Sequence, residues 1–303
     1  MKLLAIDIGG SKLMAGIVAE NGEVLDSVRT ELAPGYDADF LRDTIKTAVT
    51  SLPYAQCSAV GVTVPGLADP DSGMWVYAPF SGIENLDISS FLSSLTGLPV
   101  GIENDVNACA LAERQFGVCK DVDDYVWITL SNGIGGAVFI NGALYRGASG
   151  NAGEIGHVNV CDEDGRRCGC GMHGCLEAEA AGPAISEEYE LRTGRRLTAK
   201  AIAELANDGD TTAVEVYKRA GFLIGKALAS AVNVLNPGLA VFGGGLSNDF
   251  ELLQPSIEGA LELYMFKNAN KELRVVKTGL GYNAALLGAA TLAIKKANDS
   301  NNK

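Results

Sequence analysis

Apolar runs interrupted by glycine turns open the chain. Residues 2–8 and 12–19 are largely apolar and flank Gly9-Gly10, and a third strand is expected to follow Asn21-Gly22. Short apolar runs bounded by glycine predict β-strands, and Asn-Gly is a strong signal for a tight hairpin turn. The start of the chain therefore predicts an antiparallel meander.

A helical period comes next. Apolar residues recur at helical spacing within residues 37–51, and the buried-type strand 59–64 follows and ends at Pro65-Gly66. A helix between two strands predicts a crossover unit. Further along, the strand 99–102 leads into a helix that begins at Glu103-Asn104-Asp105 and stops at Gly117.

The opening pattern then returns. Residues 125–130 predict a strand, Gly133-Ile-Gly-Gly136 a glycine turn, residues 137–140 a second strand, and Asn141-Gly142 another hairpin turn. This repetition favours an internally duplicated α/β unit. Two unrelated hairpins in a glycine-rich protein are the alternative.

The rest of the chain alternates helix and strand. A long helix is expected from about residue 211 to 235, then a strand 239–242 that enters Gly243-Gly-Gly245, then a closing helix. We expect an N-terminal α/β domain over residues 1–117, with the closing helix, about 284–297, packing back on it. Residues 118–283 are expected to form a C-terminal α/β domain with a zinc loop at 157–175.

Length and composition agree with a two-domain enzyme. The 303 residues are 47% hydrophobic and 20% charged, which is ordinary for an α/β protein. A net charge of −13 disfavours nucleic acid and anionic membrane as partners. The longest apolar stretch, residues 222–235, is broken by Lys226 and is shorter than the ~20 residues a bilayer needs. The N-terminus does not resemble a signal peptide, so a cytoplasmic location is expected.

Two glycine hairpins carry candidate phosphate chemistry. Asp7-Ile-Gly-Gly-Ser-Lys12 places a carboxylate at a strand end, then two glycines, a hydroxyl and an ammonium, which suits a magnesium nucleotide. Its counterpart Ser131-Asn-Gly-Ile-Gly-Gly136 would let two hairpins clamp a triphosphate between the domains. Each is otherwise simply a tight turn. Gly243-Gly-Gly245 can pass under a purine or ribose, or serve as a strand-to-helix turn capped by Asn248 or Asp249.

Asp105 is the candidate general base. It lies at the start of a helix, where the macrodipole favours an ionised carboxylate. A helix N-cap is the alternative role for it.

The cysteines point to a metal site. His157, Cys168, Cys170 and Cys175 form H-x10-C-x-C-x4-C, one imidazole and three thiols, which is a full tetrahedral zinc set. His173 can replace His157 in this set, and scattered buried cysteines are the alternative. The loop would also fix two nearby carboxylates, Glu154 and Glu177, unless these are ordinary surface charges. Cys57, Cys109, Cys119 and Cys161 have no such spacing and are expected to pack in the interior.

Jointly and in order, these motifs resemble the ROK family of sugar kinases and sugar-responsive repressors. The resemblance spans nearly the whole chain, and the cysteine segment is its most specific part. It implies an α/β fold of two duplicated ribonuclease H-like domains, the actin-like ATPase fold, with a cleft between them. The motifs that carry it are Asp7-Ile-Gly-Gly-Ser-Lys12, Pro65-Gly66, Glu103-Asn-Asp105, Gly133-Ile-Gly-Gly136, Gly153-Glu154-Ile-Gly-His157, Cys168-Gly-Cys-Gly171, Gly174-Cys-Leu-Glu177 and Val241-Phe-Gly-Gly-Gly245.

The resemblance implies an ATP-dependent hexose kinase with Asp105 as catalytic base, Mg²⁺ and a structural Zn²⁺ as cofactors, and a homodimer. The implied sugar contacts are Asn104, Glu154, His157 and Glu177, and the implied metal ligands are His157, Cys168, Cys170 and Cys175. The expected nucleotide-binding residues are Asp7, Gly9, Gly10, Lys12, Gly133, Gly135, Gly136, Gly244 and Gly245.

Two departures from the family pattern bear on substrate. The second hairpin has Ser131-Asn132-Gly133 where many members have Gly-Thr-Gly. The loop before Glu103 has Pro79-Phe80-Ser81 where glucose kinases usually have Pro-Asn-Leu. An aromatic there removes a hydrogen bond to the sugar and adds an apolar wall. We expect glucose not to be the best substrate; an N-acetylhexosamine, allose, fructose or a β-glucoside are the other candidates.

Two further classes compete with the kinase. A sugar-sensing repressor of this family carries a helix-turn-helix segment before the first phosphate hairpin, whereas here Asp7 is nearly the first residue. A non-catalytic sugar-binding module is disfavoured because Asp105 and both hairpins are retained.

Overall fold

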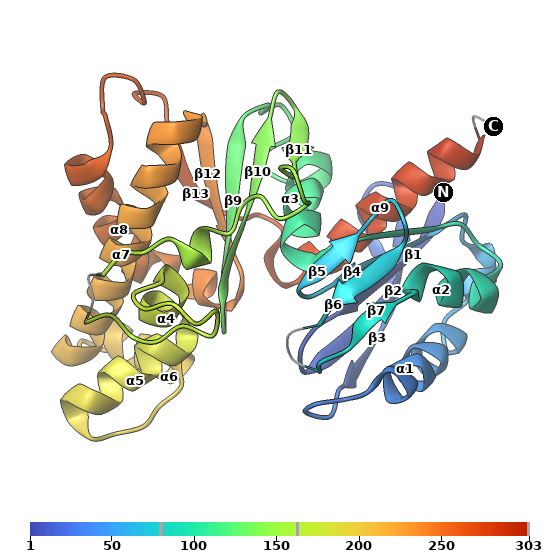
Figure 1. The fold of residues 1–303 in the computed structure, drawn as a ribbon, viewed down its shortest axis with the longest axis horizontal. Helices are drawn as coiled ribbons and strands as arrows, with labels where there is room; N and C mark the ends of the chain where they lie inside the picture. Colours follow the sequence, from blue (N-terminus) through green and yellow to red (C-terminus); the bar gives the residue numbers. More distant parts are fainter. Residues whose placement is uncertain (79–80, 162–163, 302–303) are drawn as a thin grey trace. The chain divides into compact units, whose positions relative to one another are not determined.

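The chain forms two compact units (Figure 1). The computed structural model describes residues 1–78, 81–161 and 164–301. The first unit comprises Met1–Asp121, Gly147–Asn151 and the segment from Tyr282 on, and the second comprises Val122–Arg146 and Ala152–Gly281. Among the described residues, none of the helices combines the length and the apolar character needed to cross a bilayer.

A mixed five-stranded sheet forms the centre of the first unit. Its first three strands are antiparallel neighbours joined by hairpins, which confirms the predicted meander, and the last two strands run parallel to the first. Gly22, in the turn between the strands Lys12–Ala19 and Val24–Glu31, has a φ of +90°, a conformation that glycine adopts without strain. The strand order is β3 (Val24–Glu31), β2 (Lys12–Ala19), β1 (Lys2–Ile8), β4 (Val60–Val64) and β8 (Val100–Asn104).

Helices cover both faces of this sheet. The helix α1 (Ala38–Thr50) is capped by the Asp37 carboxylate, which accepts the Phe40 N–H, and its apolar side packs on one face. On the other face α9 (Ala284–Asn301) lies directly on β4, and α3 (Asp105–Phe116) packs beside α9. A side chain at Gly61 would reach within 1.8 Å of the Ala289 carbonyl oxygen. Glycine in the strand therefore allows this close packing of helix and sheet.

The segment between β4 and β8 contains elements that the sequence patterns did not predict. A small antiparallel sheet consists of β5 (Leu67–Asp69), β6 (Met74–Tyr77) and β7 (Glu84–Leu86), and α2 (Ile88–Thr96) follows it. A 3-10 turn (Tyr54–Gln56) lies before β4. Trp75 of β6 is fully buried, and its indole N–H donates to the Pro65 carbonyl at 2.8 Å. The small sheet is thereby anchored to the end of β4.

The second unit repeats the sheet of the first. It also has a five-stranded sheet whose first three strands form an antiparallel meander and whose last two run parallel to the first of them. This shared strand order confirms the predicted internal duplication. The order is β11 (Ala143–Tyr145), β10 (Ile134–Ile140), β9 (Tyr125–Leu130), β12 (Leu239–Gly243) and β13 (Arg274–Lys277).

The second glycine hairpin differs from the expected one. The turn was expected over Gly133–Gly136, but β10 already begins at Ile134, so Gly135 and Gly136 belong to the strand. A side chain at Gly136 would lie 2.6 Å from the Gly153 carbonyl oxygen, and one at Gly153 would lie 2.4 Å from that of Gly136. These glycines therefore allow two backbone segments to touch rather than allowing the chain to turn.

Helices of the second unit pack on one another through small residues. Side chains at Gly221 and Gly225 of α7 would lie 2.6 Å and 2.5 Å from carbonyl oxygens of α8. Glycine at these two positions therefore allows α7 and α8 to pack closely. The helices of the unit are α4 (Leu176–Ala180), α5 (Gly182–Thr193), α6 (Ala199–Asn207), α7 (Thr211–Leu235) and α8 (Phe250–Tyr264), with 3-10 turns at Ile155–His157 and Gly245–Asp249. A further 3-10 turn, Gly281–Asn283, includes the last residue of this unit and the first two of the segment that returns to the first unit.

Candidate active site

The carboxyl ends of three parallel strands bring acidic residues together in the first unit. Asp7 of β1 pairs in register with Thr63 of β4, which in turn pairs with Glu103 of β8. The Thr63 hydroxyl donates to Asp7 Oδ1 at 2.9 Å. Glu103 is buried and accepts the Asn104 N–H at 3.0 Å and the Asn107 amide at 3.2 Å. Strand ends of this kind are where parallel α/β sheets place ligands.

Asp105 follows directly, as the first residue of α3, and is half-buried. Burial raises the pKa of its carboxyl to about 7, and the charge of Asp7 adds to the rise. Hydrogen bonds from the Val106 N–H and from Asn104 oppose the rise without cancelling it. Burial and a like charge thus outweigh the effect by which the helix dipole favours the ionised form of Asp105.

Asn104, rather than Asp105, is the cap of α3. Its Oδ1 accepts the N–H groups of Val106 at 2.9 Å and Asn107 at 3.1 Å. Its amide group donates to the Gly66 carbonyl at 2.8 Å and to Asp105 Oδ1 at 3.1 Å. These bonds use two acceptor and two donor positions, the full capacity of a side-chain amide. The alternative role of Asp105 as N-cap is thus taken by its neighbour, which orients it.

The first hairpin carries an unexpected partner for its lysine. The Gly9 N–H closes the turn on the Lys12 carbonyl at 2.8 Å. The Lys12 ammonium donates to the Tyr282 hydroxyl at 2.6 Å and lies 4.0 Å from the centre of that ring. Arg29 donates to the same oxygen at 3.1 Å. Tyr282 and Arg29 were missed by sequence analysis because each lies far from the hairpin in the chain.

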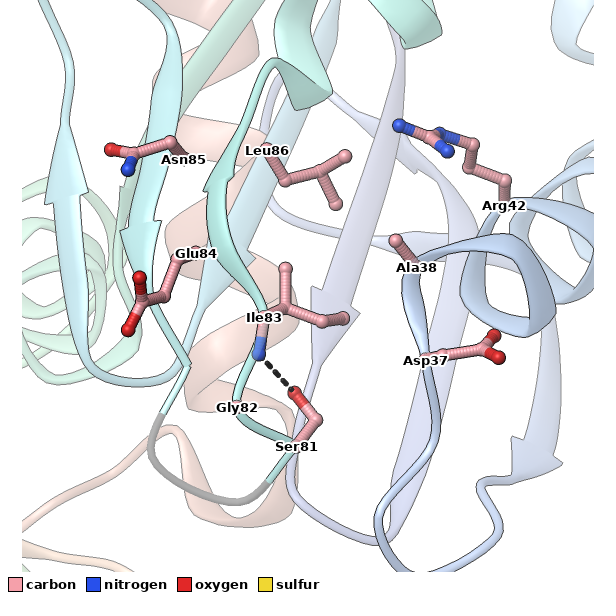
Figure 2. Close-up of a pocket in the computed structure, with 9 residues that line it drawn as sticks. All are labelled: Asp37, Ala38, Arg42, Ser81, Gly82, Ile83, Glu84, Asn85 and Leu86. Carbon is pink, nitrogen blue, oxygen red and sulfur yellow. Dashed lines mark hydrogen bonds between the residues drawn. The ribbon is translucent and has the colours of Figure 1, made fainter.

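Tyr36 connects this hairpin to a small pocket. The buried Tyr36 hydroxyl donates to the Gly9 carbonyl at 3.2 Å, and the Ser81 side chain hydrogen-bonds to it. Ser81 lines a cavity of about 330 Å³ between the start of α1 and β7. Figure 2 shows Ala38 and Ile83 facing each other across it, while Glu84 points away from α1. The lining is Asp37, Ala38, Arg42, Ser81, Gly82, Ile83, Glu84, Asn85 and Leu86.

Two charged residues of the described pocket lining already have partners. Its Asp37 carboxylate caps α1, and Arg42 forms an ion pair with Asp39 at 2.9 Å. None of the expected site residues lines it. Phe80, on which the expectation about glucose rests, lies outside the described residues.

The second hairpin is held by several neighbours in the second unit. Glu177 Oε2 accepts the Ile134 N–H at 3.0 Å, and a side chain at Gly133 would lie 2.5 Å from that same oxygen. The Gly182 N–H donates to the Ser131 carbonyl at 2.9 Å. Glu177 is thus in contact with the hairpin, in addition to the sugar contact that the family resemblance implies for it.

The turn after β12 also passes close to the hairpin. Gly244 has a φ of +84°, and a side chain there would lie 2.4 Å from the Leu130 carbonyl oxygen. Asp249 occupies the N-cap position of α8, but its side chain makes no capping hydrogen bond. Helix capping by Asp249 is therefore not seen, and the expected contact of this turn with a purine or ribose stays a prediction.

The four expected metal ligands lie together. The ligand atoms of His157, Cys168, Cys170 and Cys175 are all within 4.8 Å of one another. Cys168 Sγ lies 3.7 Å from His157 Nδ1, and Cys170 Sγ lies 3.6 Å from Cys175 Sγ. Zn–S bonds of about 2.3 Å in a tetrahedron imply ligand separations of this size. Burial raises the pKa of the Cys175 thiol to about 12, so a bound cation would be needed to hold it as thiolate at neutral pH.

His157 rather than His173 belongs to this cluster. His173 Nδ1 instead faces the Gly165 carbonyl oxygen at 3.1 Å. The second ring nitrogen of His157, Nε2, lies 3.8 Å from Glu154 Oε2. The imidazole therefore presents one nitrogen to the thiols and the other to a carboxylate, an arrangement typical of metal-bound histidine.

An ion-pair network that the sequence did not reveal holds the cysteine loop (residues 157–175). Glu179 is buried and accepts hydrogen bonds from Arg166 at 3.0 Å and Arg219 at 2.6 Å. Burial raises the pKa of Glu179, but the hydrogen bonds from Arg219 and Arg166 more than offset this and lower it. Arg166 also pairs with Glu188 at 2.7 Å, and Lys226 donates to the Val160 carbonyl at 2.8 Å. The loop is therefore tied to α4, α5 and α7.

The two five-stranded sheets share the same strand order, and each carries a glycine hairpin. Together with the carboxylate pair at the strand ends, they define a protein with the actin-like ATPase fold. The sequence matches the ROK family over residues 3–296. The chain belongs to the ROK family, and its fold is that of ROK sugar kinases.

Relatives of this chain include kinases and regulators. It is 32% identical to a glucokinase of Thermotoga maritima, over 96% of this chain and 97% of that protein. It is 35% identical to the Escherichia coli DNA-binding transcriptional dual regulator NagC, over 79% of this chain and only 60% of that protein. The crystal structure of a ROK family glucokinase from Streptomyces griseus, in complex with glucose and AMPPNP, matches with a TM-score of 0.86 at 31% identity, covering 97% of this chain and 100% of that one.

Proposed function

We propose that this chain is an ATP-dependent hexose kinase that transfers the γ-phosphoryl group of ATP to a sugar hydroxyl. The observation that carries the proposal is the position of Asp105 beside Asp7 at the carboxyl ends of β1, β4 and β8. A carboxyl with a pKa of about 7 is matched to proton acceptance near neutral pH. The similarity to glucokinases over nearly the full length of both proteins supports the same conclusion.

In the proposed mechanism Asp105 orients the sugar hydroxyl and takes its proton as the new bond to phosphorus forms. Phosphoryl transfer has a loose transition state, so positioning and charge stabilisation supply most of the rate. Asn104 keeps Asp105 in place through their 3.1 Å hydrogen bond. Asp7, backed by Thr63, offers the hard oxygen donors that Mg²⁺ prefers, and this ion would neutralise charge on the phosphates.

The glycine hairpins are the proposed phosphate contacts. Gly9, Gly10 and Lys12 in the first unit, and Gly133, Gly135 and Gly136 in the second, would meet phosphate oxygens with backbone N–H groups and the ammonium. Because the Gly9 N–H already closes its turn, Lys12 and Gly10 are expected to contribute most from the first hairpin. Gly244 and Gly245 are the proposed contacts to adenosine.

The cysteine loop and the glutamates on either side of it are the proposed sugar-binding segment. Zn²⁺ bound by His157, Cys168, Cys170 and Cys175 would be structural, since four protein ligands leave no open position. His157 Nε2, Glu154 and Glu177 would then be held as hydrogen-bonding partners for sugar hydroxyls. Asn104 would have to exchange one of its four internal hydrogen bonds to contact the sugar directly.

A coupled ADP-release assay tests the function and chooses the sugar. Glucose, N-acetylglucosamine, N-acetylmannosamine, mannose, fructose, allose and a β-glucoside should be compared by kcat/KM, with Asp105→Asn protein as the inactive control. We expect one of these sugars to give rapid turnover that the control lacks. If glucose gives the highest value, the inference from Phe80 is wrong. Turnover of none of them would contradict the proposed kinase.

Similarity to NagC makes a sugar-sensing regulator the second candidate. A regulator would bind sugar without consuming ATP. The net charge of −13 opposes DNA contact by the residues present in this chain. Sugar-dependent ADP release therefore separates the two candidates.

We further propose a homodimer. The ends of α7 and α8 lie together, because the Asn233 amide donates to the Tyr264 carbonyl at 2.9 Å and Asn233 Oδ1 accepts the Phe266 N–H at 2.8 Å. Exposed apolar side chains therefore come together there. Val234 is 82% and Phe266 65% exposed. An exposed apolar cluster of this kind marks a candidate interface. Light scattering of the purified protein would show twice the monomer mass, and a monomer at micromolar concentration would contradict the dimer.

A further inference from the structure

The backbone of Ile134, in the second hairpin, is contacted on two sides. Its N–H donates to Glu177 Oε2 at 3.0 Å. Its carbonyl oxygen faces Gly156, where an added side chain would lie only 1.9 Å away. One residue of the hairpin is therefore held between Glu177 at its N–H and Gly156 at its C=O.

Each of these two contacts adjoins a ligand of the metal cluster. Gly156 immediately precedes His157 in the 3-10 turn Ile155–His157. Glu177 lies in the first turn of α4, whose N-cap is Cys175. The Leu176 N–H also donates to the Val158 carbonyl at 2.9 Å, so the two segments run side by side. Any ion that joins His157 to Cys175 would fix the spacing between Gly156 and Glu177.

The contacts are also tight enough to transmit such a constraint. The Gly156 position allows no atom between the two backbones, and the Gly133 position leaves no room for a side chain beside the Glu177 carboxylate. Closely packed contacts of this kind move together rather than deforming separately. A carboxylate has enough acceptor positions to bind the Ile134 N–H and a sugar hydroxyl at once.

We propose that Glu177 is a positioning residue for the second phosphate hairpin, and that metal binding at the cysteine loop closes Gly156 and Glu177 on Ile134. The cysteine loop then supports nucleotide binding as well as sugar binding. This inference rests on the proposed function in one respect, namely that the hairpin binds phosphate.

Direct binding of AMPPNP without sugar tests this role, because no sugar contact then contributes. Glu177→Ala is expected to weaken AMPPNP binding about tenfold to a hundredfold, the effect of losing one hydrogen bond to a charged acceptor. Glu177→Gln keeps an acceptor oxygen and should retain most of the affinity. Glu190→Gln is a matched control, since this glutamate of α5 faces the exposed Arg196 at 3.8 Å and should leave binding unchanged.

Amide hydrogen exchange at Ile134 supplies a readout independent of nucleotide. Protection of this amide should fall in Glu177→Ala and in zinc-depleted wild-type protein, and remain in Glu177→Gln. Zinc depletion should add little further loss of AMPPNP affinity in Glu177→Ala, because both changes release the same contact.

The inference is overturned if folded Glu177→Ala protein, checked by circular dichroism, keeps wild-type AMPPNP affinity and Ile134 protection. It is also overturned if zinc depletion and Glu177→Ala act additively. Wild-type protein that binds no AMPPNP would contradict the proposed kinase instead, and the exchange experiment would still decide the role of Glu177.

Discussion

The Lys12 ammonium donates to the hydroxyl oxygen of Tyr282, at 2.6 Å, across 270 positions of sequence. An ammonium has three donors, so Lys12 can keep this bond and still meet a phosphate. Tyr282 therefore holds the lysine side chain at the hairpin and leaves two of its three donors available for a phosphate.

The first prediction concerns this pair. Lys12→Met should weaken ATP binding by about tenfold to a hundredfold, the loss of a charged hydrogen bond. Tyr282→Phe removes the hydroxyl but keeps the ring, and should raise KM for ATP a few-fold with kcat little changed. Isothermal titration with ADP and steady-state kinetics would measure both. A Lys12→Met protein with wild-type KM for ATP would exclude Lys12 from the phosphate site.

The second prediction concerns Asp105 as base. Asp105→Asn keeps the shape of the side chain and an acceptor oxygen but cannot take a proton. The turnover number should fall by roughly 10²–10⁴-fold while sugar affinity changes far less. Because the cap of α3 is Asn104, the helix should survive. Glu103→Gln is the comparison, and a larger loss there than in Asp105→Asn would transfer the role to Glu103.

The third prediction is pH dependence. The kcat/KM of the wild-type enzyme should decline below a pH of about 7, as Asp105 becomes protonated and can no longer accept a proton. Asp105→Asn should lack this acid limb in whatever activity remains. A wild-type profile that is flat down to pH 5 would contradict the raised pKa.

The same shift predicts a stability difference. Between its ordinary pKa of 3.8 and about 7, folded Asp105 keeps a proton that the unfolded chain releases, so folding stability falls as pH rises through this window. Asp105→Asn removes that cost and should be more stable than wild type, by up to about 4 kcal/mol above pH 7. Urea unfolding at pH 4 and pH 8 would measure it. The gain should disappear at the lower pH.

The fourth prediction is one zinc ion per chain. Metal analysis of protein purified without added zinc should find it, and Cys170→Ser should lower both the melting temperature and the affinity for sugar, since Glu154 and Glu177 lie directly on either side of the loop. Cys161→Ser, outside the ligand set, is the control. Unchanged sugar affinity in a zinc-free variant would separate the metal from the sugar site.

Local patterns were sufficient for much of the site. Asn141-Gly142 adopts positive φ at both residues, as an Asn-Gly hairpin turn requires. The spacing of His157 with the three cysteines placed a metal set that the fold brings together. The small sheet with β5, β6 and β7 was not predicted, because strands this short carry too few residues to show an alternating pattern.

The sequence by itself determined the two meanders, the position of the first glycine hairpin and the acidic residues at strand ends, because each depends on neighbouring residues along the chain. Only the tertiary structure decided what these residues contact. The pKa of Asp105 depends on its burial and on Asp7, the second glycine hairpin is held by Glu177, and the cysteine loop is held by the buried Glu179. Such pairs are set by which distant strands and helices meet, and the energies of burial and charge act over space rather than along the sequence.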